Sequence, residues 1–128
     1  MKGEQFIAEV KNLAELDSNE DAQKTVRATL ETLRERLAGN EPADLAAQLP
    51  PEIAPFVEGT GGREAFSVQE FYERVAHKEG TKSEEVVKHA RAVATLLQRA
   101  VTGGELEDIR SQLGNGNEEL FGQSGAST

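Results

Sequence analysis

Two similar segments occur in this chain, one in each half, and this internal repeat limits the folds that the chain can adopt. Residues 39–50 read GNEPADLAAQLP, and residues 103–114 read GGELEDIRSQLG. The identical pairs are Gly39/Gly103, Glu41/Glu105, Asp44/Asp108, Gln48/Gln112 and Leu49/Leu113. A helical unit that returns at a fixed spacing buries its apolar face against its own copy. The repeat therefore predicts two copies of one unit, packed together.

Each copy is expected to be helical, because its apolar residues recur at spacings of three and four. The first copy has the stripes Phe6, Val10, Leu13, Leu16 and Ala22, Val26, Leu30, Leu33, Leu37. The second has Phe71, Val75, Ala76 and Val86, Ala90, Val93, Leu97, Val101. The alternation of apolar and polar residues that is typical of strands is missing, and aromatic residues make up only 5% of the chain. We expect an all-α bundle about a pseudo-twofold axis, with a short helix after each long one.

Capping residues set the expected ends of these helices. The N-caps are expected at Ser18, Ser67 and Thr81, each three residues before an acidic residue. Glycine adopts the left-handed, helix-ending conformation most easily. Gly39 and the pair at 103–104 are therefore expected to end the long helices, and short helices to follow at about 41–49 and 105–113.

The length of 128 residues suits one domain. We expect this domain to cover residues 1–122, with repeats at about 4–57 and 67–121. The Gly-rich segment 58–66 is expected to join them as a flexible connector, and residues 122–128 to form a flexible tail.

Composition argues against several classes of partner and site. The net charge of −9 disfavours nucleic acid and anionic membrane surfaces. No apolar run reaches the length of about 18 residues that spans a bilayer. The chain has no cysteine, so disulfides and thiolate sites are excluded. A cytoplasmic, bacterial-type protein without cofactors is the expectation.

The polar residues of the repeated phrase are the candidate site. They are Glu41, Asp44 and Gln48 with their counterparts Glu105, Asp108 and Gln112. The two glutamates fall in the first turns of the short helices, where their charge opposes the helix dipole. These side chains either form a binding surface or cap and brace a corner of the fold. A corner must be built in both copies, whereas a catalytic group is needed once, so bracing is the favoured interpretation.

The two histidines raise a weaker possibility. His77 follows Glu73 by four residues, and His89 follows Glu85 by four. Two-metal helical bundles use a Glu–His spacing of three, so this pattern favours surface pairs over a metal site. Neither a nucleophile elbow, a phosphate loop nor a complete calcium loop occurs in the sequence. We therefore expect no catalysis.

The doubled motif resembles the bacterial family catalogued as domain of unknown function 2267. The resemblance rests on LETLRERL at 30–37, on Gly39-x-Glu41-x-x-Asp44-Leu-x-x-Gln48-Leu49-Pro50, and on the downstream segment from Phe71-x-x-x-Val75 to Leu120-Phe121. It covers roughly residues 5–122. It implies a duplicated, all-helical domain with no established activity or cofactor, in a family whose members look like accessory or stress-associated proteins.

The first functional hypothesis is a helical interaction or regulatory module that binds a protein partner or forms a homodimer. Apolar residues near helix ends could form the partner groove or plug the core: Pro50, Pro51, Pro55, Phe56, Tyr72, Leu120 and Phe121. The alternative is a small-molecule or metal-binding protein that uses the cleft between the repeats, with Glu73, His77, Glu85 and His89.

Overall fold

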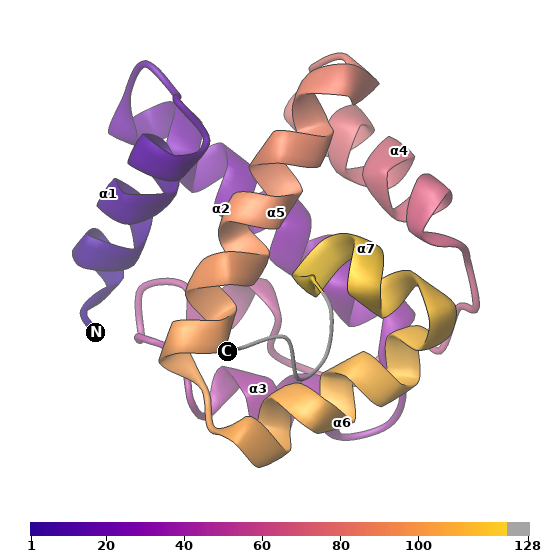
Figure 1. Cartoon of the computed structure of the whole chain (residues 1–128). Helices are drawn as coiled ribbons and strands as arrows, with labels where there is room; N and C mark the ends of the chain where they lie inside the picture. Colours follow the sequence, from indigo (N-terminus) through magenta and orange to yellow (C-terminus); the bar gives the residue numbers. More distant parts are fainter. Residues whose placement is uncertain (123–128) are drawn as a thin grey trace.

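In the computed structural model the regular secondary structure of the described part, residues 1–122, is entirely helical (Figure 1). The elements are α1 (Gly3–Leu13), α2 (Asn19–Arg36), α3 (Glu41–Ala46), η1 (Ala54–Phe56), α4 (Val68–Glu79), α5 (Ser83–Ala100), α6 (Gly103–Leu113), η2 (Gly114–Gly116) and α7 (Asn117–Phe121). The side chains of Ser83 and Asn115 are not described. The predicted tail lies, from residue 123 on, outside the described residues. The all-α prediction is confirmed.

The bounds of the helices repeat along the chain. α2 and α5 each span 18 residues, and the offset between their first residues is the one that aligns Gly39 with Gly103. α1 and α4 begin at Gly3 and Val68, which is the shift that aligns Phe6 with Phe71. The order of long and short helices is therefore the same in both halves. The pseudo-twofold axis itself stays a prediction.

The bundle has two ends, which matter for the sites below. α2 and α5 pack against each other in the middle; α1 contacts both, and so does α4 (Figure 1). α3 and α6 lie together at the lower end in this view, and the α1–α2 and α4–α5 connections lie at the upper end. Nowhere within residues 1–122 is a helix both long and apolar enough to cross a bilayer.

One hydrophobic core holds residues of both repeats. Phe6 is fully buried and Phe71 is 2% exposed, and Leu33 and Leu97 lie in the same cluster. Burying a side chain of this size stabilises the fold by about 1.5–3 kcal/mol. The repeats thus bury their apolar faces in a shared interior.

Leu13 departs from the predicted stripe, since it is 41% exposed. Residues four apart share a helix face, so the face of Phe6 and Val10 continues to Ala14, which is 3% exposed. Leu13 lies to one side of that face. The predicted stripe is thus right at Phe6 and Val10 and wrong at Leu13, and Leu16 lies beyond the end of α1, partly buried against the core.

Two of the three predicted caps are confirmed. Ser18 Oγ accepts from Asp21 N at 3.1 Å, and Ser67 Oγ accepts from Glu70 N at 3.1 Å. Thr81 is not a cap: α5 begins after Lys82, and the Thr81 hydroxyl donates to Glu79 Oε1 at 2.9 Å. The Thr81 hydroxyl therefore donates a charge-assisted hydrogen bond to a buried carboxylate, whereas a cap would accept from a helix N–H.

The long helices end before their predicted glycines. Their C-caps are Leu37 and Val101, both with extended backbones. Gly39, at φ +58°, lies in the following turn, and Gly103 is the first residue of α6, with Thr102 as its N-cap. In both copies an extended residue, fixed by tertiary packing, ends the helix one or two positions earlier than glycine would.

The connector between the repeats is hydrogen-bonded to the end of α2. Gly61 N donates to Gly39 O, and Arg63 N donates to Leu37 O, both at 3.0 Å. A Cβ atom at Gly61 would overlap the carbonyl oxygen of Leu37, so only glycine allows this approach. The segment predicted to be flexible thus runs along α2 at this point.

Candidate functional site

The six predicted site residues lie at the α3/α6 end, and three of them form a cluster. Oxygen atoms of Glu41, Glu105 and Asp108 all lie within 4.8 Å of one another. Asp44 stays exposed on α3. The structure therefore joins one acidic residue of the first copy to two of the second.

Glu105 is the buried member of this cluster, with 7% of its surface exposed. Burial, followed by a hydrogen bond with Glu41 and the charges of Glu41, Asp44 and Asp108, raises its pKa to about 8. The Oε2 atoms of Glu105 and Glu41 are both buried, and neither has a hydrogen-bond partner of normal geometry within the described chain. Carboxylates in this arrangement require a proton or a cation.

The two glutamines bind the opposite repeat. Gln112 Oε1 accepts from Ala38 N at 2.7 Å, and Gln48 Oε1 accepts from Thr102 N at 2.8 Å. Ala38 and Thr102 occupy equivalent positions in the two repeats, as the glutamines do. Each copy thus satisfies a backbone N–H of the other at the turn that follows the long helix.

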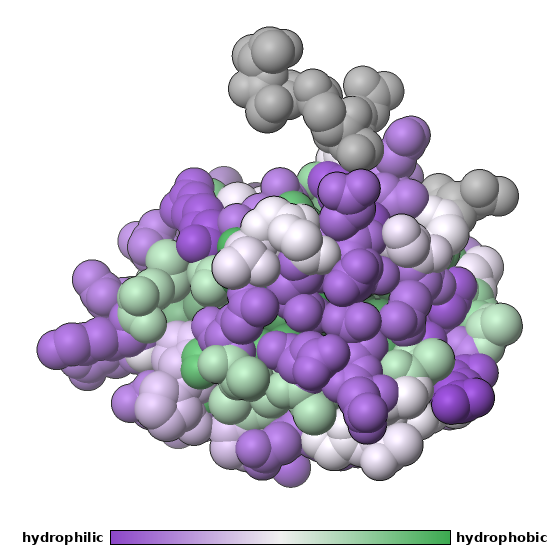
Figure 2. All heavy atoms as spheres, turned by 90° about the horizontal axis from the view of Figure 1, so that it is seen from below, coloured by the Kyte–Doolittle hydropathy of each residue, from purple (hydrophilic) through white to green (hydrophobic). Residues whose placement is uncertain are grey.

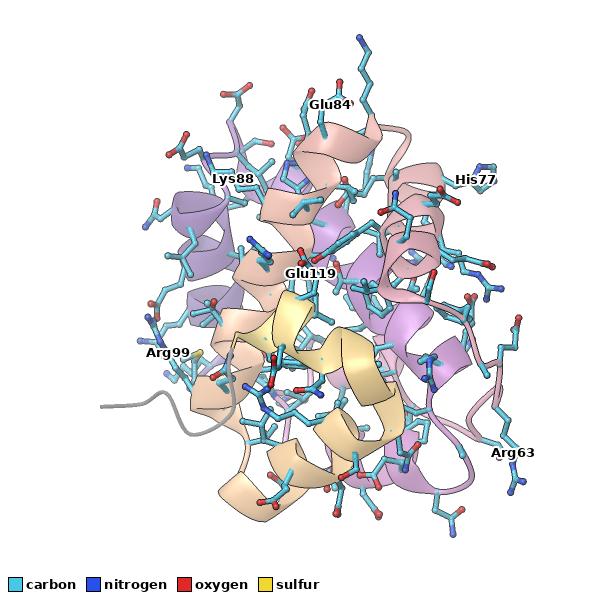
Figure 3. The ribbon with its side chains drawn as sticks, turned by 45° about the vertical axis from the view of Figure 1, so that its right-hand side comes forward. Arg63, His77, Glu84, Lys88, Arg99 and Glu119 are labelled. Carbon is cyan, nitrogen blue, oxygen red and sulfur yellow. The ribbon has the colours of Figure 1, made fainter. Side chains whose placement is uncertain are left out.

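A cleft of about 500 Å³ lies at the opposite end, between the α1–α2 and α4–α5 connections. Both repeats contribute to its walls. The lining residues are Ala14, Glu15, Leu16, Asp17, Asp21, Lys24 and Thr25 from the first, and Glu79, Thr81, Glu84, Glu85, Lys88 and His89 from the second. Glu84 and Lys88 project from α5 at this end in Figure 3.

A buried Glu79–His89 pair forms the floor of the cleft. The side chains are 1% and 8% exposed, and Glu79 Oε1 lies 2.9 Å from His89 Nδ1. Burial alone would raise the pKa of Glu79, but hydrogen bonds from His89, Thr25 and Thr81 outweigh it and lower the pKa. An ionised carboxylate only accepts, so Nδ1 is the donor. Glu79 Oε2 is buried without a hydrogen bond that meets normal geometry.

At the rim of the cleft, Glu15 forms an ion pair with Lys88 and has an unusual backbone conformation. Lys88 Nζ lies 2.7 Å from Glu15 Oε1, and this hydrogen bond and the lysine charge lower the pKa of Glu15. Glu15 has φ +56°, a left-handed conformation that side chains other than glycine rarely adopt. The equivalent position of the second repeat is Gly80, at φ +75°. The first repeat thus has a glutamate at a position where glycine would adopt the same backbone conformation with less strain.

The charge of the cleft is predominantly negative. Its lining has six carboxylates against two lysines, and one of these lysines, Lys88, is already paired with Glu15. Low-dielectric walls concentrate such a field. A cationic ligand is favoured on these grounds over an anionic one.

The four residues of the hypothetical metal site, Glu73, His77, Glu85 and His89, do not come together. His77 is exposed and points away from α5 (Figure 3), and His89 pairs with Glu79, not with Glu85. Only Glu85 and His89 of the four line the cleft. Within the described range, the group of three or more ligand side chains that comes together is the α3/α6 cluster.

Glu79 was missed by the reasoning from sequence, although a signal was present. Phe71, Val75 and Glu79 lie four apart on one face of α4. A glutamate at the next position of an apolar stripe indicates a buried carboxylate, which must find partners. That signal was available without the structure.

The predicted apolar residues near helix ends differ in burial: Pro51 and Pro55 are exposed and Phe56 is partly buried, whereas Pro50, Tyr72, Leu120 and Phe121 are buried. Tyr72, Leu120 and Phe121 are 4–6% exposed. Across residues 1–122 the exposed large hydrophobic side chains are Met1 and Leu13. Figure 2, which views the molecule from the α3/α6 end, shows small apolar areas separated by hydrophilic ones. These findings give a partner groove no support.

Comparison with known proteins places the chain among proteins without an assigned role. The sequence model of the family described as "Uncharacterized conserved protein (DUF2267)" matches residues 3–120. This match confirms the resemblance drawn from the repeated motif. No match was found among curated proteins.

Proposed function

The chain belongs to the DUF2267 family of uncharacterized conserved proteins, and from that premise we propose that it binds a small organic cation in the cleft between its two repeats. The family description assigns no activity, and the proposal is for binding without catalysis. The observation that carries it is the buried, ionised Glu79 at the floor of a cleft of about 500 Å³.

The lowered pKa keeps the buried carboxylate of Glu79 ionised at neutral pH, so a fixed negative charge is present at the floor of the cleft. His89 and Thr81 both bond to Oε1 of Glu79, whereas Oε2 has no hydrogen bond of normal geometry to a described residue. An ammonium group in the cleft is attracted to this fixed negative charge.

The rim selects for the same ligand chemistry. Asp17, Asp21 and Glu84 line the opening, and no basic side chain of the described chain lies within 4.0 Å of their carboxylates. A second amine on the ligand would meet these accessible carboxylates while the first lies toward Glu79. The fit is therefore to a short diamine or polyamine.

The opposite end has a different proposed role. The reciprocal hydrogen bonds of Gln48 and Gln112 support the interpretation that these residues brace the corner. A hydrogen bond of this kind contributes about 0.5–1.5 kcal/mol to stability, so each glutamine has a structural reason to be present. Binding of the organic cation does not require this end.

The test is isothermal titration of the chain with putrescine and with spermidine. We expect saturable binding of one molecule per chain, weakened by salt because the attraction is electrostatic. Glu79→Gln keeps the shape and removes the charge, and is expected to lower the affinity by about tenfold or more. Circular dichroism of the variant checks that it remains folded.

Two controls keep the result specific. Glu73→Gln removes the same charge from the exposed side of the same helix, α4, and should leave the affinity unchanged. Butanediol has the length of putrescine without its charges and should not bind. Equal binding of butanediol and putrescine, or equal loss in the two variants, would contradict the proposal.

Other expectations stay predictions. A protein partner or a homodimer, a regulatory or stress-associated role and a cytoplasmic location are consistent with cation binding. The direct check on the first is light scattering with and without spermidine, since a dimer would double the molar mass.

A further inference from the structure

We propose that Glu41, Glu105 and Asp108 form a binding site for one hard divalent cation of the Ca²⁺ class at the junction of α3 and α6. This site lies at the opposite end of the bundle from the cleft and is independent of the function proposed above. It would tie the first repeat to the second through a metal ion.

The spacing of the oxygens suits such an ion. One oxygen from each side chain lies within 4.8 Å of the others. Ca²⁺ takes oxygen ligands at about 2.4 Å, so two on opposite sides of the ion lie up to about 4.8 Å apart. The three oxygens can therefore surround one ion without a rearrangement of the helices.

Two of the three ligand side chains have a buried oxygen that lacks a hydrogen-bond partner among the described residues. Glu105 is 7% exposed, and its Oε2 is buried without a hydrogen bond of normal geometry to a described residue. Glu41 Oε2 is in the same condition, although Glu41 Oε1 lies 3.4 Å from the Gln112 amide nitrogen, which donates to it. Buried carboxylate oxygens are normally paired, and a bound cation would pair both at once.

The local charge also matches a divalent ion. The three carboxylates bring about three negative charges when ionised. The N-terminus of α6 offsets part of this charge at Glu105, which lies in its first turn. No lysine, arginine or histidine of the described residues forms a salt bridge with any of the three.

The repeat explains how the ligands meet. Each copy carries Glu-x-x-Asp at the start of its short helix, at 41–44 and at 105–108. Packing of α3 against α6 brings the two copies of the motif together. Asp44 remains exposed, so the site uses one ligand from the first copy and two from the second.

The experiment is calorimetric titration of chelator-treated protein with CaCl₂, with NaCl at equal ionic strength as reference. We expect one Ca²⁺ per chain and a rise in melting temperature with Ca²⁺ concentration. Glu105→Gln is isosteric and is expected to weaken Ca²⁺ binding by more than about tenfold, since even a change of a group that only supports a ligand costs that much. Asp108→Asn is expected to act in the same direction.

Glu107→Gln is the matched control, because Glu107 lies exposed on the same helix and loses the same charge. It should bind Ca²⁺ as the unaltered chain does. Absence of binding, or several weakly held ions with the same affinity in Glu105→Gln and Glu107→Gln, would overturn the proposal. Putrescine binding is expected to survive in Glu105→Gln, which separates this test from that of the cleft.

Discussion

At the α3/α6 end the two repeats present matching residues to each other, whereas at the cleft they present different ones. Gln48 and Gln112 occupy equivalent positions and make the same hydrogen bond in opposite directions. Around the cleft, Glu79 corresponds to Ala14 of the first copy, and His89 to Thr25. The glutamines kept in both copies solve a structural problem that both copies share, whereas Glu79 and His89, present once, are free to serve the organic cation.

The loops that follow α1 and α4 show the same contrast, because they have the same backbone hydrogen bond but different side chains. Leu16 N donates to Lys11 O, and Thr81 N donates to Ala76 O, so both helices end in the same turn. At the left-handed residue of that turn one copy has glycine and the other Glu15. Strain tolerated in one copy is a reason to look for a function there.

The largest effect is expected from the matched core pair Leu45 and Ile109, both fully buried. Truncation to alanine leaves a cavity and should lower the free energy of unfolding by about 2–5 kcal/mol in each case. Urea denaturation of Leu45→Ala and Ile109→Ala measures both. Similar losses are expected of equivalent positions; a loss confined to one variant would break the symmetry of this end.

Next in size are the bracing glutamines. Gln48→Ala and Gln112→Ala each remove a hydrogen bond between the repeats, and each should lower the free energy of unfolding by about 0.5–1.5 kcal/mol. The bonds join different atoms, so the double variant should lose the sum of the two. Denaturation curves that show no loss for either single variant would remove the structural role assigned to this end.

Most of the fold could be predicted from the sequence, because the apolar stripes and the repeated phrase already define helices that need each other. The stripe of α2, from Ala22 to Leu37, is buried throughout. The helix ends were less predictable. Thr81 has the spacing of a cap, yet its hydroxyl bonds to a carboxylate that the sequence alone does not place beside it.

The two sites differ in the same way. The repeated phrase named Glu41, Glu105 and Asp108, but the burial of Glu105 results from the packing of α3 on α6. The Glu79–His89 pair joins two helices across the turn between them, a contact that helical periodicity does not predict. Both features depend on tertiary contacts, which the sequence pattern does not define.

Stability against pH should show opposite signs at the two ends in chelator-treated protein. The pKa of Glu79 is lowered in the fold, so its contribution is present above its unfolded value of about 4.5 and is lost as the pH falls through the folded value. The pKa of Glu105 is raised to about 8, so its contribution is present below about 4.5 and is lost as the pH rises through about 8.

Melting temperatures between about pH 3 and pH 9 measure both effects. Glu79→Gln should flatten the acid side of the profile, and Glu105→Gln the alkaline side. If both variants change the same side of the pH profile, the two ends of the bundle do not differ in the sign of their pH dependence.

The smallest effects concern the left-handed positions. Gly80→Ala places a Cβ on a left-handed backbone and should cost about 1 kcal/mol. Glu15→Gly makes the opposite change and should raise the melting temperature while it weakens putrescine binding through loss of the rim carboxylate. Thermal melts and titration calorimetry together check both. A Glu15→Gly variant with lower stability and unchanged affinity would remove Glu15 from the account.

The most direct test of the central claim is a titration of the chain with putrescine followed by amide NMR spectra. We predict saturable shifts at residues 14–25 and 79–89, the two segments that line the cleft, with the α3/α6 end unchanged. The same titration of Glu79→Gln should give much smaller shifts. Shifts that do not saturate, or that gather around α3 and α6, would contradict the assignment of ligand binding to the end where the two repeats differ.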